Sequence, residues 1–180
     1  MRVTMATAAR PGRANEDFVG GIPNAVVLVD GAGIPGGKAT CRHGVAWYAA
    51  RLGGALLSRL ARAEGRDLRS VLADAIEQVT DEHSDRCDVT NPISPSAAVA
   101  IVRVADGVVD HLVLGDAVVL LDPTPGPPVV LEDRREVVIS ASYRSALEEA
   151  VSAEERDRVL GELRAPVPSP GGSVALSSLG

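Results

Sequence analysis

The acidic residues near the start of the chain are the best candidates for chemistry. Asp30 directly follows an apolar run over residues 25–29, and Glu16 and Asp17 lie upstream of it. A continuous, mostly β-branched run predicts a buried strand, and a glycine-rich reversal over residues 20–24 would bring the chain back. Carboxylates at two adjacent strand ends repel each other unless a cation lies between them. The pattern predicts a divalent metal site, although Asp30 alone, followed by glycine, would more simply be a turn residue.

The other residue types that could do chemistry have simpler interpretations. Cys41 and Cys87 are the only cysteines and form no Cys-x-x-Cys pair, so no structural zinc site is predicted and both thiols should be reduced and at least half-buried. His43 could act as a general acid, but a capping or surface role is the simpler interpretation. The other two histidines are expected to be solvent-facing or structural. Asp116 is interpreted as a turn residue and not as a ligand.

The composition describes a globular domain. The chain has 180 residues, 46% of them hydrophobic and 23% charged, which is enough to bury a core. The net charge of -6 and the 2% aromatic content argue against a nucleic-acid partner. No signal segment or membrane-length apolar run is visible, so we expect a cytoplasmic protein without a membrane segment. Residues 1–164 should form the domain, and residues 165–180, rich in Pro, Gly and Ser, a loose tail.

Short apolar runs separated by turn residues predict the strands. Strands are expected over residues 2–8, 15–19, 25–29, 97–104, 108–114, 117–121, 129–131 and 136–140. Asp106 and Gly107 form the strongest hairpin signal in the chain. The strands from residue 97 onward should form an antiparallel meander, because short turns join consecutive strands.

Apolar residues at three- and four-residue spacing predict two helices between the strands at 25–29 and 97–104, and a third helix after the last strand. The first helix should run for about twenty residues from His43, with Gly53 and Gly54 marking close packing on a sheet. The second should begin after Asp67 as its N-cap, and a third, charged helix is expected over residues 143–163. The order of elements predicts an α+β fold with helices stacked on antiparallel sheet. The expected core includes Leu52, Leu56, Val71, Ala75, Ile101 and Leu112.

Four segments stand in an order that is itself informative. They are Arg13-Ala-Asn-Glu-Asp17, Val27-Leu-Val-Asp-Gly-Ala-Gly33, Ser94-Pro-Ser-Ala-Ala-Val-Ala100 and Leu114-Gly-Asp-Ala-Val-Val-Leu120. Together they resemble motifs of the protein phosphatase 2C family of metal-dependent phosphatases. The pair of helices between the second and third segments matches the order of that family as well. The resemblance covers the chain from about residue 3 to residue 140.

The resemblance implies two antiparallel β-sheets packed as a sandwich and flanked by helices, with a binuclear Mg²⁺ or Mn²⁺ centre at one end. By motif position, Asp30 would bridge the two cations and Gly31 would offer its main-chain carbonyl. Glu16 and Asp17 would be the remaining acids at the metals. The implied reaction is hydrolysis of phosphoserine or phosphothreonine in proteins by a metal-activated water. Phosphoproteins would then be the substrates.

The sequence departs from the family pattern in two places. The phosphate-binding arginine would fall on Gly12, so Arg13, or alternatively Arg10, would act beside Asp30 in catalysis. The family also has two late metal-binding aspartates, before Gly and Asn, whereas the late aspartates of this chain precede Pro or Arg. They are Asp122, Asp133 and Asp157.

The missing aspartates leave an alternative function open. The chain could be a non-catalytic, phosphatase-like module that binds one cation weakly or none. Counting ligands predicts that it hydrolyses p-nitrophenyl phosphate with Mn²⁺ no better than its Asp30→Ala variant, because the attacking water needs both cations to lower its pKa.

Overall fold

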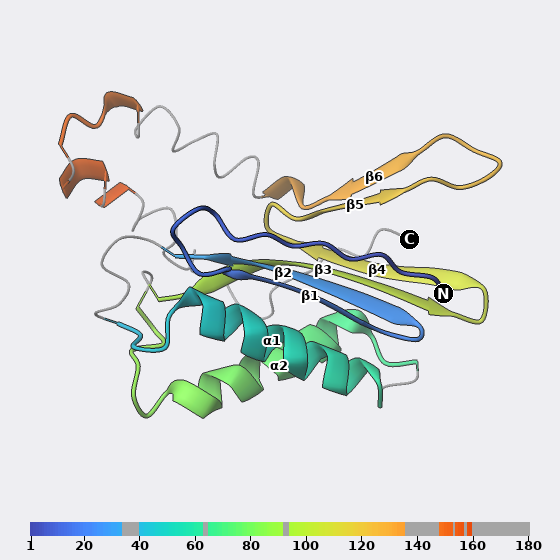
Figure 1. Cartoon of the computed structure of the whole chain (residues 1–180), viewed down its shortest axis with the longest axis horizontal. Coiled ribbons are helices and arrows are strands. Elements are labelled where there is room, and N and C mark those ends of the chain that lie inside the picture. Colours follow the sequence, from blue (N-terminus) through green and yellow to red (C-terminus); the bar gives the residue numbers. More distant parts are fainter. Residues whose placement is uncertain are drawn as a thin grey trace, which may run out of the picture.

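The computed structural model describes residues 1–33, 40–62, 65–91, 94–135, 148–152, 154–156 and 158–159. Its elements are β1 (Asp17–Ile22), β2 (Ala25–Ala32), α1 (Val45–Leu60), α2 (Leu68–His83), β3 (Ser96–Ala105), β4 (Val108–Leu114), β5 (Val118–Leu121) and β6 (Val129–Glu132). Strands β1 to β4 form an antiparallel sheet in chain order, and β5 pairs with β6 in a second antiparallel sheet. Both helices lie on one side of the larger sheet and the β5–β6 pair on the other (Figure 1). The predicted α+β class with two antiparallel sheets is confirmed.

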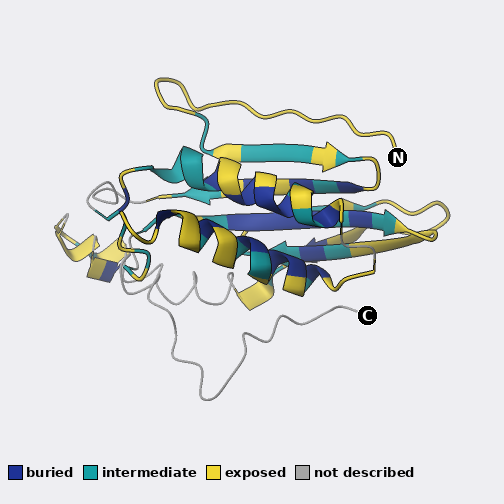
Figure 2. Cartoon of the chain, turned by 90° about the horizontal axis from the view of Figure 1, so that it is seen from below, coloured by how far each residue is buried: buried dark blue, intermediate teal, exposed yellow. Residues whose placement is uncertain are grey.

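The main core lies between the four-stranded sheet and the two helices. Alternate residues of β2 face the helices, so Ala25, Val27 and Val29 are completely buried. The buried residues of both helices lie on the side toward the sheet (Figure 2). The expected core is confirmed, because its predicted members are all at most 7% exposed. These are Leu52, Leu56, Val71, Ala75, Ile101 and Leu112.

The opposite face of the sheet has a much smaller core. Ala98 and Ala100 of β3 pack there with Ala117, next to β5. The outward side chains of the β5–β6 pair are apolar and exposed: Val118 is 56% and Leu120 63% exposed. The predicted sandwich is therefore present as a four-stranded sheet with a two-stranded second layer.

Local turn and cap signals place the element boundaries well. The β3–β4 hairpin turns at Asp106 and Gly107, whose φ angles of 52° and 78° are those that Asp-Gly hairpin turns require. Asp67 caps α2, because its side chain accepts a hydrogen bond from the main-chain N–H of Ser70 at 3.3 Å. Both features were predicted.

Some expected elements differ or cannot be compared. Residues 2–8 form no strand, because no neighbouring strand pairs with them and their side chains are exposed (Figure 1). The first helix begins at Val45, two residues after His43. Residues 136–140 and the tail over 165–180 lie outside the described residues. The expected continuous helix over 143–163 is wrong in its described part, because residues 150–152 are not helical. Ser152 accepts a hydrogen bond from the N–H of Glu155 at 3.1 Å, as the N-cap of a new helical segment does. In the described part of the chain, neither helix is long and apolar enough to cross a membrane.

Candidate metal centre

Asp17 and Asp30 lie opposite each other on neighbouring strands. Asp17 is the first residue of β1, and the antiparallel register pairs it with Asp30 of β2. Directly opposed residues have Cβ atoms about 4.5–5.5 Å apart. Their neighbours Phe18 and Val29 face the helices, so both carboxylates point to the other face of the sheet. The hairpin that the sequence predicted therefore brings these two acids together.

The pair carries an excess of negative charge. The pKa of Asp30 is raised above its ordinary value, first by desolvation and then by the charge of Asp17 and a hydrogen bond with it. The charge of Asp116 raises the pKa further, whereas the guanidinium of Arg10 lowers it. Crowded carboxylates of this kind fit a hard divalent cation, which prefers oxygen ligands and would relieve the repulsion.

Asp116 is the acid whose position sequence reasoning missed. It lies in the turn after β4, which agrees with its predicted turn role. That turn packs on the sheet beside the pair: a Cβ on Gly115 would stand 3.0 Å from the Cβ of Ala98, and Ala98 is the register partner of Asp30. Asp116 therefore adds a third carboxylate whose charge acts on Asp30. The Gly-Asp segment quoted above was the available signal.

Gly31 allows the start of β1 to approach β2 closely. A Cβ on Gly31 would lie 2.2 Å from the main-chain oxygen of Glu16 and 2.6 Å from Cγ1 of Val45. Any side chain at position 31 would force these segments apart. Glu16 thus contacts the site through its main chain, and its carboxylate is not among the charges that shift the pKa of Asp30. The structure brings Asp17, Asp30 and Gly31 together, and Glu16 lies beside them through its main chain.

Arg10 and Arg13 occupy opposite ends of one turn. The N–H of Arg13 donates to the carbonyl of Arg10 at 3.1 Å, and Gly12 between them has a φ of 75°. Arg10 is among the main influences on the pKa of Asp30, which it lowers, and Arg13 is not. Its guanidinium is therefore better placed than that of Arg13 to meet an anion at the carboxylates.

Asp133 is the late acid that lies next to this region. It accepts a hydrogen bond from the N–H of Gly115 at 3.4 Å and forms an ion pair with Arg135 at 2.6 Å. Arg135 lowers the pKa of Asp133, mainly through their hydrogen bond. The carboxylate is thus engaged in the protein. Asp122 is exposed in a loop, and Asp157 lies outside the described residues.

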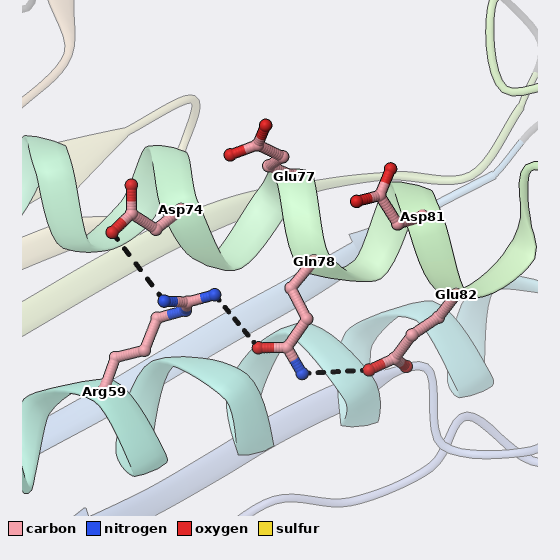
Figure 3. Close-up of a pocket in the computed structure, with 6 residues that line it drawn as sticks. All are labelled: Arg59, Asp74, Glu77, Gln78, Asp81 and Glu82. Carbon is pink, nitrogen blue, oxygen red and sulfur yellow. Dashed lines mark hydrogen bonds and ion pairs between the residues drawn. The ribbon is translucent and has the colours of Figure 1, made fainter.

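The polar hollow between α1 and α2 is a less convincing site. Arg59 contacts Asp74 at 3.7 Å and donates to Gln78 at 3.1 Å, and Gln78 donates to Glu82 at 2.9 Å (Figure 3). Glu77 points away from this network. These contacts join two largely exposed helix surfaces, although Arg59 Nε has no hydrogen-bond partner among the described residues. The hollow is best explained as a solvated contact between the helices.

A second cluster joins residues that the sequence analysis interpreted separately. Cys41, His43 and Cys87 converge, and their ligating atoms all lie within 4.8 Å of one another. Desolvation and the hydrogen bond to Cys41 raise the pKa of the Cys87 thiol, which disfavours a free nucleophilic thiolate. The absence of a Cys-x-x-Cys pair was therefore misleading, because the fold brings the two cysteines together from different segments.

Comparisons with known proteins give little beyond these observations. No family model and no curated protein matches the sequence. Among solved structures, the serine/threonine phosphatase PstP/Ppp of Mycobacterium tuberculosis is similar over 88% of each chain, with 14% identity and a TM-score of 0.41. At this level of similarity, function has to be inferred from the residues of the site.

Proposed function

We propose that the chain is a phosphatase 2C-like domain that binds one Mg²⁺ or Mn²⁺ at Asp17 and Asp30 and recognises phosphoserine or phosphothreonine in proteins. The observation that carries this proposal is the opposed pair of carboxylates, with the charge of Asp116 also acting on Asp30. A cation between the two carboxylates would remove their mutual repulsion, which is why the pair suits a metal and not merely a turn.

Phosphate recognition at this cluster should depend on the cation. Three carboxylates and one guanidinium repel a phosphate dianion when no cation is bound. A bound divalent cation offsets that excess negative charge, and Arg10 is then free to donate hydrogen bonds to phosphate oxygens. The phosphate of a phosphorylated side chain would therefore bind to the cation and to Arg10 at the same time.

The ligand count limits hydrolysis. A Mg²⁺ or Mn²⁺ held by Asp17 and Asp30 would supply positive charge that lowers the pKa of a water, and the family chemistry uses two such ions. Among the described residues, the acids at the cluster suffice for one ion only. We therefore expect the isolated chain to bind phosphorylated side chains without appreciable turnover.

An active phosphatase is the second candidate, and one observation favours it. Asp133 already contacts Gly115, next to Asp116, and its carboxylate is held there by the side chain and the main-chain N–H of Arg135. If Asp133 exchanged Arg135 for a cation, the centre would gain a late acid like those of the family.

Binding and turnover of a phosphothreonine peptide distinguish the two candidates. We expect the wild-type chain to bind the peptide only with Mn²⁺, and Asp30→Ala to lose that binding. Asp81→Ala, an exposed aspartate of α2, is the matched control and should behave like wild type. Mn²⁺-dependent hydrolysis that Asp30→Ala and Asp133→Asn both abolish would establish the active phosphatase. Peptide binding that is equal with and without Mn²⁺ would refute both candidates.

A further inference from the structure

Both cysteines and two of the three histidines of the chain meet at one end of the helical layer. Cys41 and His43 lie between β2 and α1, whereas His83 is the last residue of α2 and Cys87 follows it. The only tryptophan, Trp47, stacks on His43 with ring centroids 4.3 Å apart. These side chain types are few in the sequence, and none of these residues takes part in the carboxylate cluster.

The three ligating atoms form a compact triangle. The sulfur atoms of Cys41 and Cys87 are 3.3 Å apart. Nδ1 of His43 lies 3.4 Å from the Cys87 sulfur and 4.0 Å from the Cys41 sulfur. Cys41 is buried and Cys87 partly exposed, so the triangle lies at the edge of the core.

These separations fit the edges of a zinc coordination tetrahedron. With Zn–S distances of about 2.3 Å and Zn–N distances of about 2.0–2.1 Å, tetrahedral angles place two sulfurs about 3.8 Å apart and sulfur and nitrogen about 3.6 Å apart. The observed distances of 3.3, 3.4 and 4.0 Å lie within about 0.5 Å of these values. A small outward movement of the two thiols would therefore accommodate the ion.

The positions of the side chains are held by the surrounding structure. The main-chain N–H of Asp88 donates to the carbonyl of Thr40 at 2.9 Å, and that of Cys87 donates to His83 at 3.0 Å. The stacking of His43 on Trp47, at an interplanar angle of 22°, fixes the plane of the imidazole ring. The two segments are thus joined directly beside the triangle, which reduces the ordering that metal binding would require.

We propose that Cys41, His43 and Cys87 bind Zn²⁺, with one tetrahedral position left for water or another ligand. Two sulfurs and an imidazole nitrogen select a thiophilic ion over Mg²⁺ or Mn²⁺. On binding, each thiol loses its proton to solvent and the two thiolates neutralise the ion, while neutral His43 donates the lone pair of Nδ1. The site joins the segment that leads into α1 to the end of α2.

A disulfide is the main competing explanation for the short distance between the sulfurs. A disulfide would need only Cys41 and Cys87, and it gives no reason for Nδ1 of His43 to face both sulfur atoms. Zinc uses all three groups. The two explanations also predict opposite effects of Zn²⁺ on oxidation, because a metal-bound thiolate is protected and a free pair of thiols is not.

Cobalt substitution of the full, reduced chain tests the proposal independently of any phosphatase chemistry. We expect Co²⁺ to give thiolate-to-metal charge-transfer bands and the intense visible bands of a tetrahedral site, at one ion per chain, with Zn²⁺ displacing it. Cys87→Ser and His43→Gln should each weaken Co²⁺ binding by at least about tenfold. His111→Gln, a histidine of β4 outside the cluster, and Asp30→Ala should leave the spectrum unchanged.

Thiol protection in the wild-type chain gives a second measurement that needs no variant. Zn²⁺ should slow both alkylation of the two cysteines and their oxidation in air, and a chelator should restore both rates. Absence of the thiolate bands would overturn the proposal. So would bands that survive Cys87→Ser, or a Cys41–Cys87 disulfide that forms equally fast with and without Zn²⁺.

Discussion

Gly53 of α1 rests directly on the ring of Phe18 in β1. A Cβ at position 53 would lie 2.1 Å from Cδ1 of that ring, whereas a Cβ at the adjacent Gly54 would meet nothing within 4 Å. This contact brings α1 close to the edge strand that carries Asp17. The sequence analysis predicted such close packing of the helix on the sheet from Gly53 and Gly54.

The two glycines should therefore respond to alanine in opposite directions. Gly53→Ala must displace Phe18 or the helix and should lower the free energy of unfolding by about 1–3 kcal/mol. Gly54→Ala should raise it by about 1 kcal/mol, because alanine is the better helix former and the site is open. Urea unfolding of both variants checks this, and equal effects of the same sign would contradict the packing.

The N-cap of α2 gives a second stability prediction. Asp67→Ala removes the acceptor for the N–H of Ser70 and should lower the free energy of unfolding by about 1 kcal/mol. Asp67→Asn keeps a capping oxygen and should stay close to wild type in the same measurement. If Asp67→Asn were as unstable as Asp67→Ala, the charge and not the cap would be the stabilising feature.

The raised pKa of Asp30 predicts how stability depends on pH. Because folded Asp30 binds its proton more tightly than unfolded Asp30, its ionisation destabilises the fold as pH rises above 3.8, the ordinary value. Asp30→Asn should therefore be more stable than wild type at neutral pH. That advantage should shrink as the pH falls toward and below the ordinary pKa.

Asp133→Asn is the control with the opposite sign. Arg135 lowers the pKa of Asp133, so its ionised form stabilises the fold above the ordinary pKa, and that contribution is lost as pH falls. Asp133→Asn should be less stable than wild type at neutral pH and converge with it in acid. Thermal unfolding across pH, without divalent cations, measures both variants. The same pH trend in both would contradict the assignment of charges at the cluster.

The two arginines of the N-terminal turn should differ in phosphate binding. Arg10→Ala should weaken Mn²⁺-dependent binding of a phosphothreonine peptide by about tenfold, the loss of one charge-assisted hydrogen bond. Arg13→Ala should change it little. Isothermal titration at constant Mn²⁺ compares the two variants. A larger loss of binding in Arg13→Ala would show that Arg13, which the sequence resemblance favoured, is the phosphate-binding arginine.

Local sequence signals predicted the fold more completely than they predicted the candidate sites. Asp106 and Gly107 define their hairpin through their own backbone preferences, and the helix stripes define the core face. Residues 2–8 show the limit of this reasoning, because weak alternation does not reveal whether a neighbouring strand is available to pair with them. An unpaired segment stays irregular whatever its pattern.

Long-range placement explains what was missed at the sites. Asp17 and Asp30 could be paired because one short hairpin connects them. Asp116 reaches the same place only after two helices and two further strands, and its Gly-Asp segment by itself indicated only a turn. Cys41 and Cys87 are 46 residues apart and meet because α1 and α2 pack antiparallel. Both additions needed the tertiary structure.

Mn²⁺ binding to the carboxylate pair is the most direct test of the central claim. Electron paramagnetic resonance of free Mn²⁺ should show one ion bound per chain with a Kd on the order of 1 mM, as expected for an incomplete oxygen site. Cys41→Ser should bind equally well, which separates this site from the thiol cluster. Asp81→Ala should match wild type, whereas Asp30→Ala should bind at least about tenfold more weakly, a change of about 1.4 kcal/mol. Equal Mn²⁺ binding by wild type and Asp30→Ala would contradict the account.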